Sequence, residues 1–147
     1  MINIQASQVI NRPLSEVFEY VSDFHNNPSW QPIKQVKKLT SGPMRKGTKI
    51  RQVFDFRGAR QHIDVEITDF KPAQKFSYKY VSPLASSNDE FHFMEVDGKT
   101  RVMISGKMKF PLLYRMSEPI VAPHLQKQAE ISLRDLKQIL ESQKEDG

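Results

Sequence analysis

Residues 91–110, FHFMEVDGKTRVMISGKMKF, carry the pattern that decides the fold. On both sides of Asp97-Gly98, the dipeptide preferred in a two-residue type I′ turn, apolar residues alternate with polar ones. Successive side chains of a strand point to opposite faces, so this pattern predicts a β-hairpin with one apolar and one charged face. The apolar face consists of Phe91, Phe93, Val102, Ile104, Met108 and Phe110, and the charged face includes Arg101, Lys107 and Lys109.

The same alternation extends back to Ile33 and is divided by strong turn signals. Six strands in hairpin order result, and the loosely alternating residues 2–10 add a seventh at the N-terminus. The chain is therefore predicted to form a seven-stranded antiparallel sheet with one buried, aromatic face. The turn signals are Ser41-Gly42-Pro43, Arg57-Gly58-Ala59-Arg60, Lys71-Pro72-Ala73-Gln74, Ser82-Pro83 and Asp97-Gly98.

Two helical regions accompany this sheet. Pro13 suits the first turn of a helix, and residues 13–30 predict two short helices separated near Asn26-Asn27. The last third predicts one long helix, because a single apolar stripe about five turns long runs along it. That helix can only be buried against the sheet, and we expect it to begin near Pro123 or to be kinked there. The stripe consists of Leu125, Ala129, Leu133, Leu136 and Leu140. The expected fold class is α+β.

Composition limits the chemistry that the chain can perform. The 147 residues predict a single domain over residues 1–147. There is no cysteine, which excludes a disulfide scaffold, a thiolate nucleophile and any Cys-ligated metal, and which is typical of a reducing compartment. The N-terminus lacks a signal-peptide pattern, and no stretch of 18 apolar residues occurs, so we expect a cytoplasmic protein.

The order of these elements and three sequence stretches carry a resemblance to a known family. The stretches are residues 11–24 with 27–30 (NRPLSEVFEYVSDF and NPSW), residues 93–102 (FMEVDGKTRV) and the helical stripe from Leu125 to Leu140. Together they are similar to the START/Bet v 1-like (SRPBCC) superfamily, in particular its polyketide cyclase/dehydrase and lipid-transport branch. No single stretch is diagnostic, but their order and spacing cover nearly the whole chain.

This resemblance implies a helix-grip fold, in which a curved sheet wraps a long C-terminal helix. It also implies an apolar cavity between the two, open near the helical pair and the hairpin loops. The ligands implied are hydrophobic small molecules such as lipids, sterols, isoprenoid quinones and polyketides. No reaction is implied, because many members catalyse none and the catalytic residues of the others differ.

The aromatic face provides the candidate ligand-binding residues. Rigid aromatic rings give a large contact area, and a tyrosine hydroxyl can orient the polar end of a bound molecule. The alternative is that this face closes as solid core, as in any protein that packs a helix on a sheet. The candidates are Trp30, Phe54, Phe56, Tyr78, Tyr80, Phe91, Phe93, Met108 and Leu125, with His124 and Gln128 on the long helix.

Titratable residues on the strands are expected to face solvent. His62, Asp64 and Glu66 alternate with apolar residues, and His92 lies between two inward-facing phenylalanines. His25 and His124 could form an acid–base pair at the cavity entrance, but capping, solvation or ordinary polar packing is the favoured interpretation. No catalytic residue is assigned.

No pattern for a metal or cofactor is present. Metal-ligand spacings, a Gly-rich phosphate loop and a nucleophile elbow are all missing from the sequence. We therefore expect neither a bound metal nor a cofactor.

The densest charged segment, residues 34–51, contains seven basic residues and no acidic one. Such a segment could contact anionic lipid headgroups or ribosomal RNA. The favoured interpretation is a solvated hairpin whose edge lysines prevent pairing between sheets. Nucleic-acid binding is not favoured, because no exposed aromatics are interleaved with the charges. The basic residues are Lys34, Lys37, Lys38, Arg45, Lys46, Lys49 and Arg51.

The sequence favours a protein that binds a hydrophobic small molecule between the sheet and the C-terminal helix. One alternative is a cofactor-independent polyketide cyclase or dehydratase that uses a Tyr, His or carboxylate to move a proton. The other is an interaction protein that docks on a ribosome or a membrane through residues 34–51. Whether the protein is a monomer or a homodimer stays open.

Overall fold

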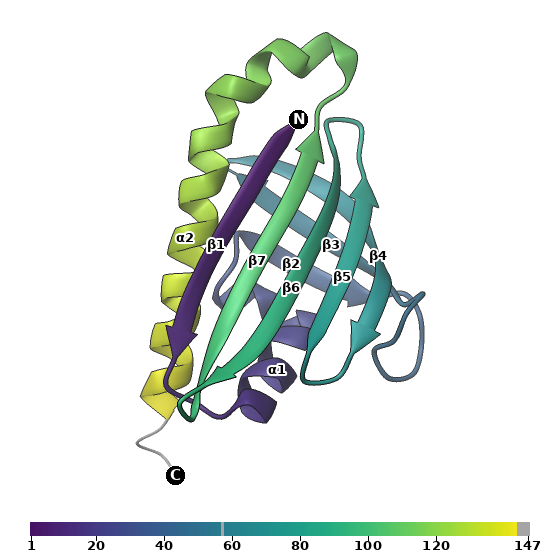
Figure 1. Ribbon diagram of the computed structural model, residues 1–147. Coiled ribbons are helices and arrows are strands. Elements are labelled where there is room, and N and C mark those ends of the chain that lie inside the picture. Colours follow the sequence, from purple (N-terminus) through teal and green to yellow (C-terminus); the bar gives the residue numbers. More distant parts are fainter. Residues whose placement is uncertain (57, 144–147) are drawn as a thin grey trace.

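The computed structural model describes residues 1–56 and 58–143, apart from the side chain of Phe56. A strand and two short helical elements come first, six strands follow, and a long helix ends the chain (Figure 1). The elements are β1 (Ile2–Ile10), α1 (Leu14–Ser22), the 3₁₀ helix η1 (Phe24–Ser29), β2 (Ile33–Lys38), β3 (Lys49–Phe56), β4 (Ala59–Lys71), β5 (Lys75–Val81), β6 (Ser86–Val96), β7 (Lys99–Lys109), the 3₁₀ helix η2 (Leu112–Ser117) and α2 (Glu118–Ser142).

The strands form one antiparallel sheet in the order β1-β7-β6-β5-β4-β3-β2. Strands β2 to β6 each pair with the next strand along the chain, and β1 pairs with β7 at one edge. Asp97 and Gly98, with φ of 52° and 80°, join β6 to β7 in the left-handed conformation that a type I′ turn requires. The predicted seven-stranded sheet is confirmed.

The alternation of the strands assigns the two faces as expected. In β4, Ile63, Val65 and Ile67 are buried, whereas His62 and Asp64 are exposed. Arg51 Nε of β3 donates to Asp64 Oδ1 at 2.8 Å on the outer face, which is therefore the solvated face.

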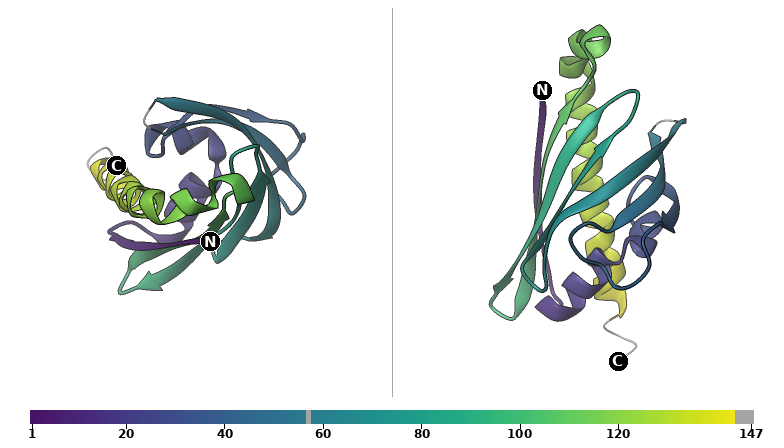
Figure 2. Two further views of the ribbon diagram at one scale, coloured as in Figure 1. Left: turned by 90° about the horizontal axis from the view of Figure 1, so that it is seen from above. Right: turned by 90° about the vertical axis from the view of Figure 1, so that its right-hand side faces the viewer.

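Helix α2 lies against β1 and within the curve of the sheet (Figure 2). Leu133, Leu136 and Leu140 are fully buried there, in agreement with the predicted stripe. None of the helices in the described part of the chain is long and apolar enough to cross a membrane.

Helix α2 begins before Pro123, at Glu118, and continues through the proline. The Glu118 carboxylate accepts the backbone N–H of Phe110 at 2.7 Å and pairs with the amino group of Met1 at 2.5 Å. These contacts anchor the first turn, which accounts for its persistence although Pro123 cannot donate a helical hydrogen bond.

Helix α1 covers one end of the groove between the sheet and α2. The Phe18 ring meets the rings of Phe70, Phe76 and Phe93 edge-on, with centroids 5.6, 6.3 and 5.0 Å apart. This aromatic cluster closes that end as solid core.

Candidate functional site

The groove between the sheet and α2 stays open at the end far from α1. An outer pocket of about 420 Å³ lies there, between the sheet, η2 and the first turns of α2. Its wall is mostly apolar, and the exposed side chains of Leu84 and Tyr114 belong to its rim. Apolar residues of its wall include Phe54, Ile63, Met108, Phe110, Val121 and Leu125.

A smaller inner pocket of about 140 Å³ continues along α2 toward the core. It shares Phe54, Ile63, Tyr80, Met108 and Leu125 with the outer pocket. Its wall contains polar side chains that do not line the outer pocket, among them one carboxylate: Gln52, Tyr78, Asp89, Gln128 and Ser132.

Most of the predicted ligand-binding residues lie in these walls. Leu125 marks the border, since it is 9% exposed whereas Leu136 on the same stripe is 0% exposed. Their role in binding stays a prediction. The predicted residues that line one or both pockets are Trp30, Phe54, Tyr78, Tyr80, Phe91, Met108, Leu125 and Gln128.

Two predicted residues line neither pocket. Phe93 packs into the aromatic cluster under α1. It is the next inward residue of β6 after Phe91 and lies nearer the end of the strand that α1 covers. His124 is exposed on α2, since it precedes the buried stripe position Leu125 and turns away from the sheet. Phe56 was a further candidate, but its side chain lies outside the described residues.

The sequence reasoning missed Asp89. It is two residues from Phe91 and therefore on the aromatic face of β6, and this charged residue among inward positions was the available signal. Gln52, buried on β3, is a polar residue among inward positions and gives a similar signal, and its Oε1 accepts from Asn27 Nδ2 at 2.9 Å. Parity along a strand would have placed both in the groove.

The carboxyl group of Asp89 is held by hydrogen bonds from its own sheet. Ser87 Oγ donates to Asp89 Oδ1 at 3.0 Å, and the Tyr78 hydroxyl is a second partner. Burial raises the pKa of Asp89 to about 6, although both hydrogen bonds oppose that rise. Burial and the neighbouring carboxylate also raise the pKa values of Tyr78 and Tyr80, so both phenols keep their protons at neutral pH.

The two histidines that could have formed an acid–base pair lie at opposite ends of the molecule. His25 is in η1, where its Nδ1 is 3.1 Å from Asp23 Oδ1, whereas His124 is near the start of α2. The entrance expected beside the helical pair is likewise not where the outer pocket lies. Of the two openings that the resemblance implied, the outer pocket lies at the one beside the hairpin loops, near Leu84.

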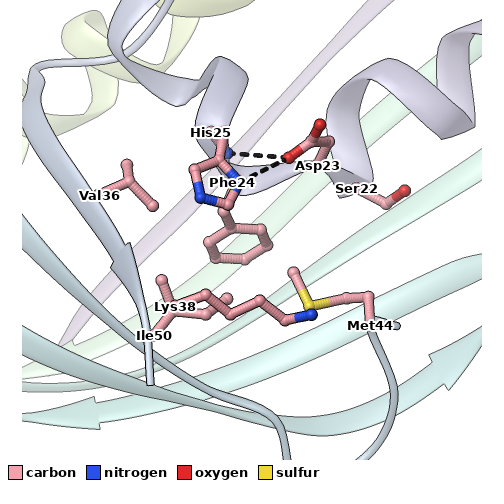
Figure 3. A pocket seen from close by; sticks show the side chains of 8 residues that line it. All are labelled: Ser22, Asp23, Phe24, His25, Val36, Lys38, Met44 and Ile50. Carbon is pink, nitrogen blue, oxygen red and sulfur yellow. Dashed lines mark hydrogen bonds and ion pairs between the residues drawn. The ribbon is translucent and has the colours of Figure 1, made fainter. Parts of the chain in front are cut away.

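A separate side pocket of about 210 Å³ lies between η1 and strands β2 and β3. Figure 3 shows Asp23 and His25 on one side of it, Lys38 and Met44 across from them, and the Phe24 ring between. Phe24 is buried and also contacts Tyr78, with ring centroids 5.6 Å apart, so its ring separates this side pocket from the groove.

The basic segment 34–51 covers the edge strand β2, the connection after it and the start of β3. Lysines on an edge strand agree with protection against pairing between sheets. Arg51 is paired with Asp64 on the outer face. The segment contributes to the side pocket, through Lys38 and Met44, but not to the wall of the outer pocket.

Comparison with solved structures shows the same fold. The chain is similar to TTHA0849 from Thermus thermophilus, with 16% identity over 92% of this chain and 94% of that one and a TM-score of 0.79. The Zhui aromatase/cyclase from Streptomyces sp. R1128 has 16% identity, 96% and 94% coverage and a TM-score of 0.78. Ara h 8.0201 has 13% identity, 95% and 97% coverage and a TM-score of 0.71.

Sequence comparison gives the family. No functionally curated protein sequence matches the chain significantly. The sequence profile of the family described as polyketide cyclase / dehydrase and lipid transport matches residues 1–141. With the helix-grip architecture, this match over nearly the whole chain shows that the protein belongs to the polyketide cyclase / dehydrase and lipid transport family.

Proposed function

We propose that this protein binds one largely apolar small molecule in the groove between the sheet and α2. The observation that carries this proposal is the outer pocket of about 420 Å³, with its mostly apolar wall. Ligand sites of this kind are concave, have volumes of roughly 300–1,000 Å³ and combine apolar walls with a few polar groups. The adjoining inner pocket supplies such polar groups.

Native mass spectrometry of freshly purified protein is the first test. A co-purified apolar molecule would support the proposal, and its mass would give its chemical class. Thermal melting with 2-naphthalenemethanol, a neutral probe of matching character, is the second test. A bound probe raises the melting temperature with its concentration by mass action.

Two methionine variants on β7 make the second test specific to the groove. Met108 lines both pockets, whereas Met103 lies at an outward position of the same strand. Met108→Trp should abolish the rise in melting temperature by filling the groove, and Met103→Trp should keep it. No rise with the unmodified protein and no co-purified molecule would refute the proposal.

Proton transfer to or from the bound molecule is a second candidate function, favoured by Asp89 and Tyr78. Two titratable groups in hydrogen-bonding contact, one of them with a pKa of about 6, are suited to general acid–base chemistry near neutral pH. The Asp89 carboxylate would remove a proton from the carbon next to a carbonyl, leaving its electron pair in the enolate, and would later return a proton there.

Deuterium exchange of 2-tetralone in D₂O, followed by NMR, tests this second function. Exchange next to the carbonyl should be faster with the protein than with buffer, and Asp89→Asn should remove the difference. Asp64→Asn, which changes an exposed carboxylate of the outer face, is the matched control. Equal exchange with the protein and with Asp89→Asn would exclude this function without affecting the binding proposal.

A further inference from the structure

The inner pocket holds a carboxylate without a cation. Among the described residues that line the two pockets, Asp89 is the single charged group, since no Lys, Arg or His is present there. A carboxylate in such surroundings repels any anionic ligand, and the repulsion is stronger than in water because the local dielectric constant is lower. The pocket thus discriminates between ligands by charge.

The neighbouring strand leaves space for this carboxylate. Gly106 of β7 is the direct cross-strand partner of Asp89, and a methyl group built on Gly106 would overlap Asp89 Oδ1. Gly106 is not among the residues with a left-handed φ. At this position a glycine is therefore required for space and not for backbone conformation, and it allows the Asp89 carboxyl to lie against β7.

On its other side, Asp89 is paired with Tyr78 of β5. The Tyr78 hydroxyl and Ser87 Oγ both interact with the carboxyl group, which fixes its position in the pocket wall. A carboxylate has about four lone-pair sites, so these two partners leave acceptor capacity for a ligand.

The inner pocket also contains a donor without a partner. Trp30 is 3% exposed and lines the pocket, and its Nε1 has no hydrogen-bond partner in the part of the chain that the structure describes. A buried indole N–H usually has a hydrogen-bond partner, and leaving that hydrogen bond unmade costs about 1–3 kcal/mol. The Trp30 indole thus forms part of the pocket wall, and its N–H lacks an acceptor among the described residues, whereas Asp89 in the same wall is an acceptor.

We propose that the ligand carries a neutral hydroxyl group, which lies in the inner pocket and donates a hydrogen bond to Asp89, while its apolar body fills the outer pocket. This inference rests on the proposed binding function. A hydroxyl can both donate to Asp89 and accept from Trp30, whereas a carboxylate can only accept and an ammonium group can only donate. Ligands with a carboxylate at this end, such as fatty acids, are rejected.

Discrimination against carboxylates depends on pH through Asp89. It is strong above about pH 6, where the group is ionised, and weak below it, where the group is neutral. The titratable groups that face Asp89 are Tyr78 and Tyr80, both protonated over this range. Its hydrogen-bond donor Ser87 on the same strand is uncharged. The nearby residues of the inner-pocket wall are uncharged too: Gln52 of β3, Gly106 and Met108 of β7, and Gln128 and Ser132 of α2.

Three probes with the same aromatic body test this inference by calorimetric titration: 2-naphthalenemethanol, 2-naphthylmethylamine and 2-naphthoate. At pH 8 the alcohol should bind at least about tenfold more tightly than the carboxylate, the usual scale of a charge-assisted discrimination. At pH 5 this ratio should fall to about threefold or less, because Asp89 is then protonated.

Three variants test whether Asp89 causes the discrimination between the alcohol and the carboxylate. Asp89→Asn should reduce the ratio to about threefold at both pH values, whereas the exposed control Asp64→Asn should leave it unchanged. Gly106→Ala keeps the charge but displaces the carboxyl, and it should weaken binding of the alcohol about tenfold. If a variant does not fold, the pH series on the unmodified protein still tests the inference.

The outcomes separate this inference from the function on which it rests. Equal binding of alcohol and carboxylate at pH 8, or a ratio that Asp89→Asn leaves unchanged, overturns the inference but leaves the binding function standing. Tighter binding of the amine than of the alcohol overturns it too, because charge pairing would then select the ligand. Binding of none of the probes, with no co-purified molecule, overturns both.

Discussion

The two ends of the groove between the sheet and α2 use the same kinds of residues and reach opposite results. At the end covered by α1, Phe18, Phe76 and Phe93 interlock with the stripe residues of α2, and the core is closed. At the other end, Phe54 and Tyr80 face Leu125 across open space. An apolar, aromatic face therefore gives solid core or a cavity wall according to what covers it.

The elements that cover each end of the groove explain this difference. Helix α1 and the Phe24 ring of η1 fill the space above β5 and β6 at one end. At the other end η2 and the first turns of α2 extend beyond the sheet, and Leu112, Leu113, Met116 and Ile120 of this segment are exposed. Stability should therefore depend on the closed end, and ligand binding on the open end.

The largest expected effect is on stability, from the same substitution made at two positions of α2. Leu136→Ala should lower the free energy of unfolding by about 3–5 kcal/mol, because it leaves a cavity in packed core. Leu125→Ala should cost only about 1–2 kcal/mol, because Leu125 already borders empty space. Urea unfolding measures both, and equal losses would contradict the distinction between the ends.

The second effect is on the pH dependence of stability. Asp89 has a pKa of about 6 in the folded protein against 3.8 ordinarily, so the folded state binds its proton more tightly. The stabilisation that comes from this tighter proton binding is fully present below about pH 4 and is lost as the pH rises through about 6. The stability of Asp89→Asn relative to the unmodified protein should therefore rise by about 1–3 kcal/mol between pH 4 and pH 8. Unfolding titrations across this range check it, and a pH-independent difference would contradict a raised pKa.

The third effect is on ligand affinity and reverses the order of the two leucine variants. Leu125→Ala should weaken the binding of 2-naphthalenemethanol about three- to tenfold, because apolar contact with the ligand is lost. Leu136→Ala should leave the affinity unchanged wherever the protein remains folded. Calorimetric titration gives both values, and a similar loss in both variants would show that the ends are coupled.

The smallest effect is expected at His124. This side chain is exposed on α2 and lines neither pocket. His124→Ala should change the free energy of unfolding by less than about 0.5 kcal/mol and leave probe affinity unchanged. A clear loss of affinity would show that His124 contributes to the binding site and would contradict this prediction.

Much of the candidate site could be predicted from parity and periodicity alone. The assignment of Phe54, Tyr78, Tyr80 and Phe91 to one face depends only on the two-residue repeat of a strand. Phe93 has the same parity as Phe91, yet it lies in solid core. Parity gives the face of a strand, but the position along that face depends on where α1 crosses it.

Asp89 shows the same division. Its inward orientation could have been inferred from Phe91, two residues away, but its properties could not. The raised pKa, the partner Tyr78 on β5 and the space above Gly106 on β7 all depend on neighbours from other strands. The antiparallel register brings these residues together from positions 11 and 17 residues distant along the chain.

The sequence by itself determined the elements, their buried faces and the family resemblance, because strand alternation, turn residues and a helical stripe are local properties of the chain. Only the tertiary structure decided where the groove is filled and where it stays open. That outcome depends on the volumes and crossing positions of α1, η2 and α2 over one curved sheet, which no local pattern encodes.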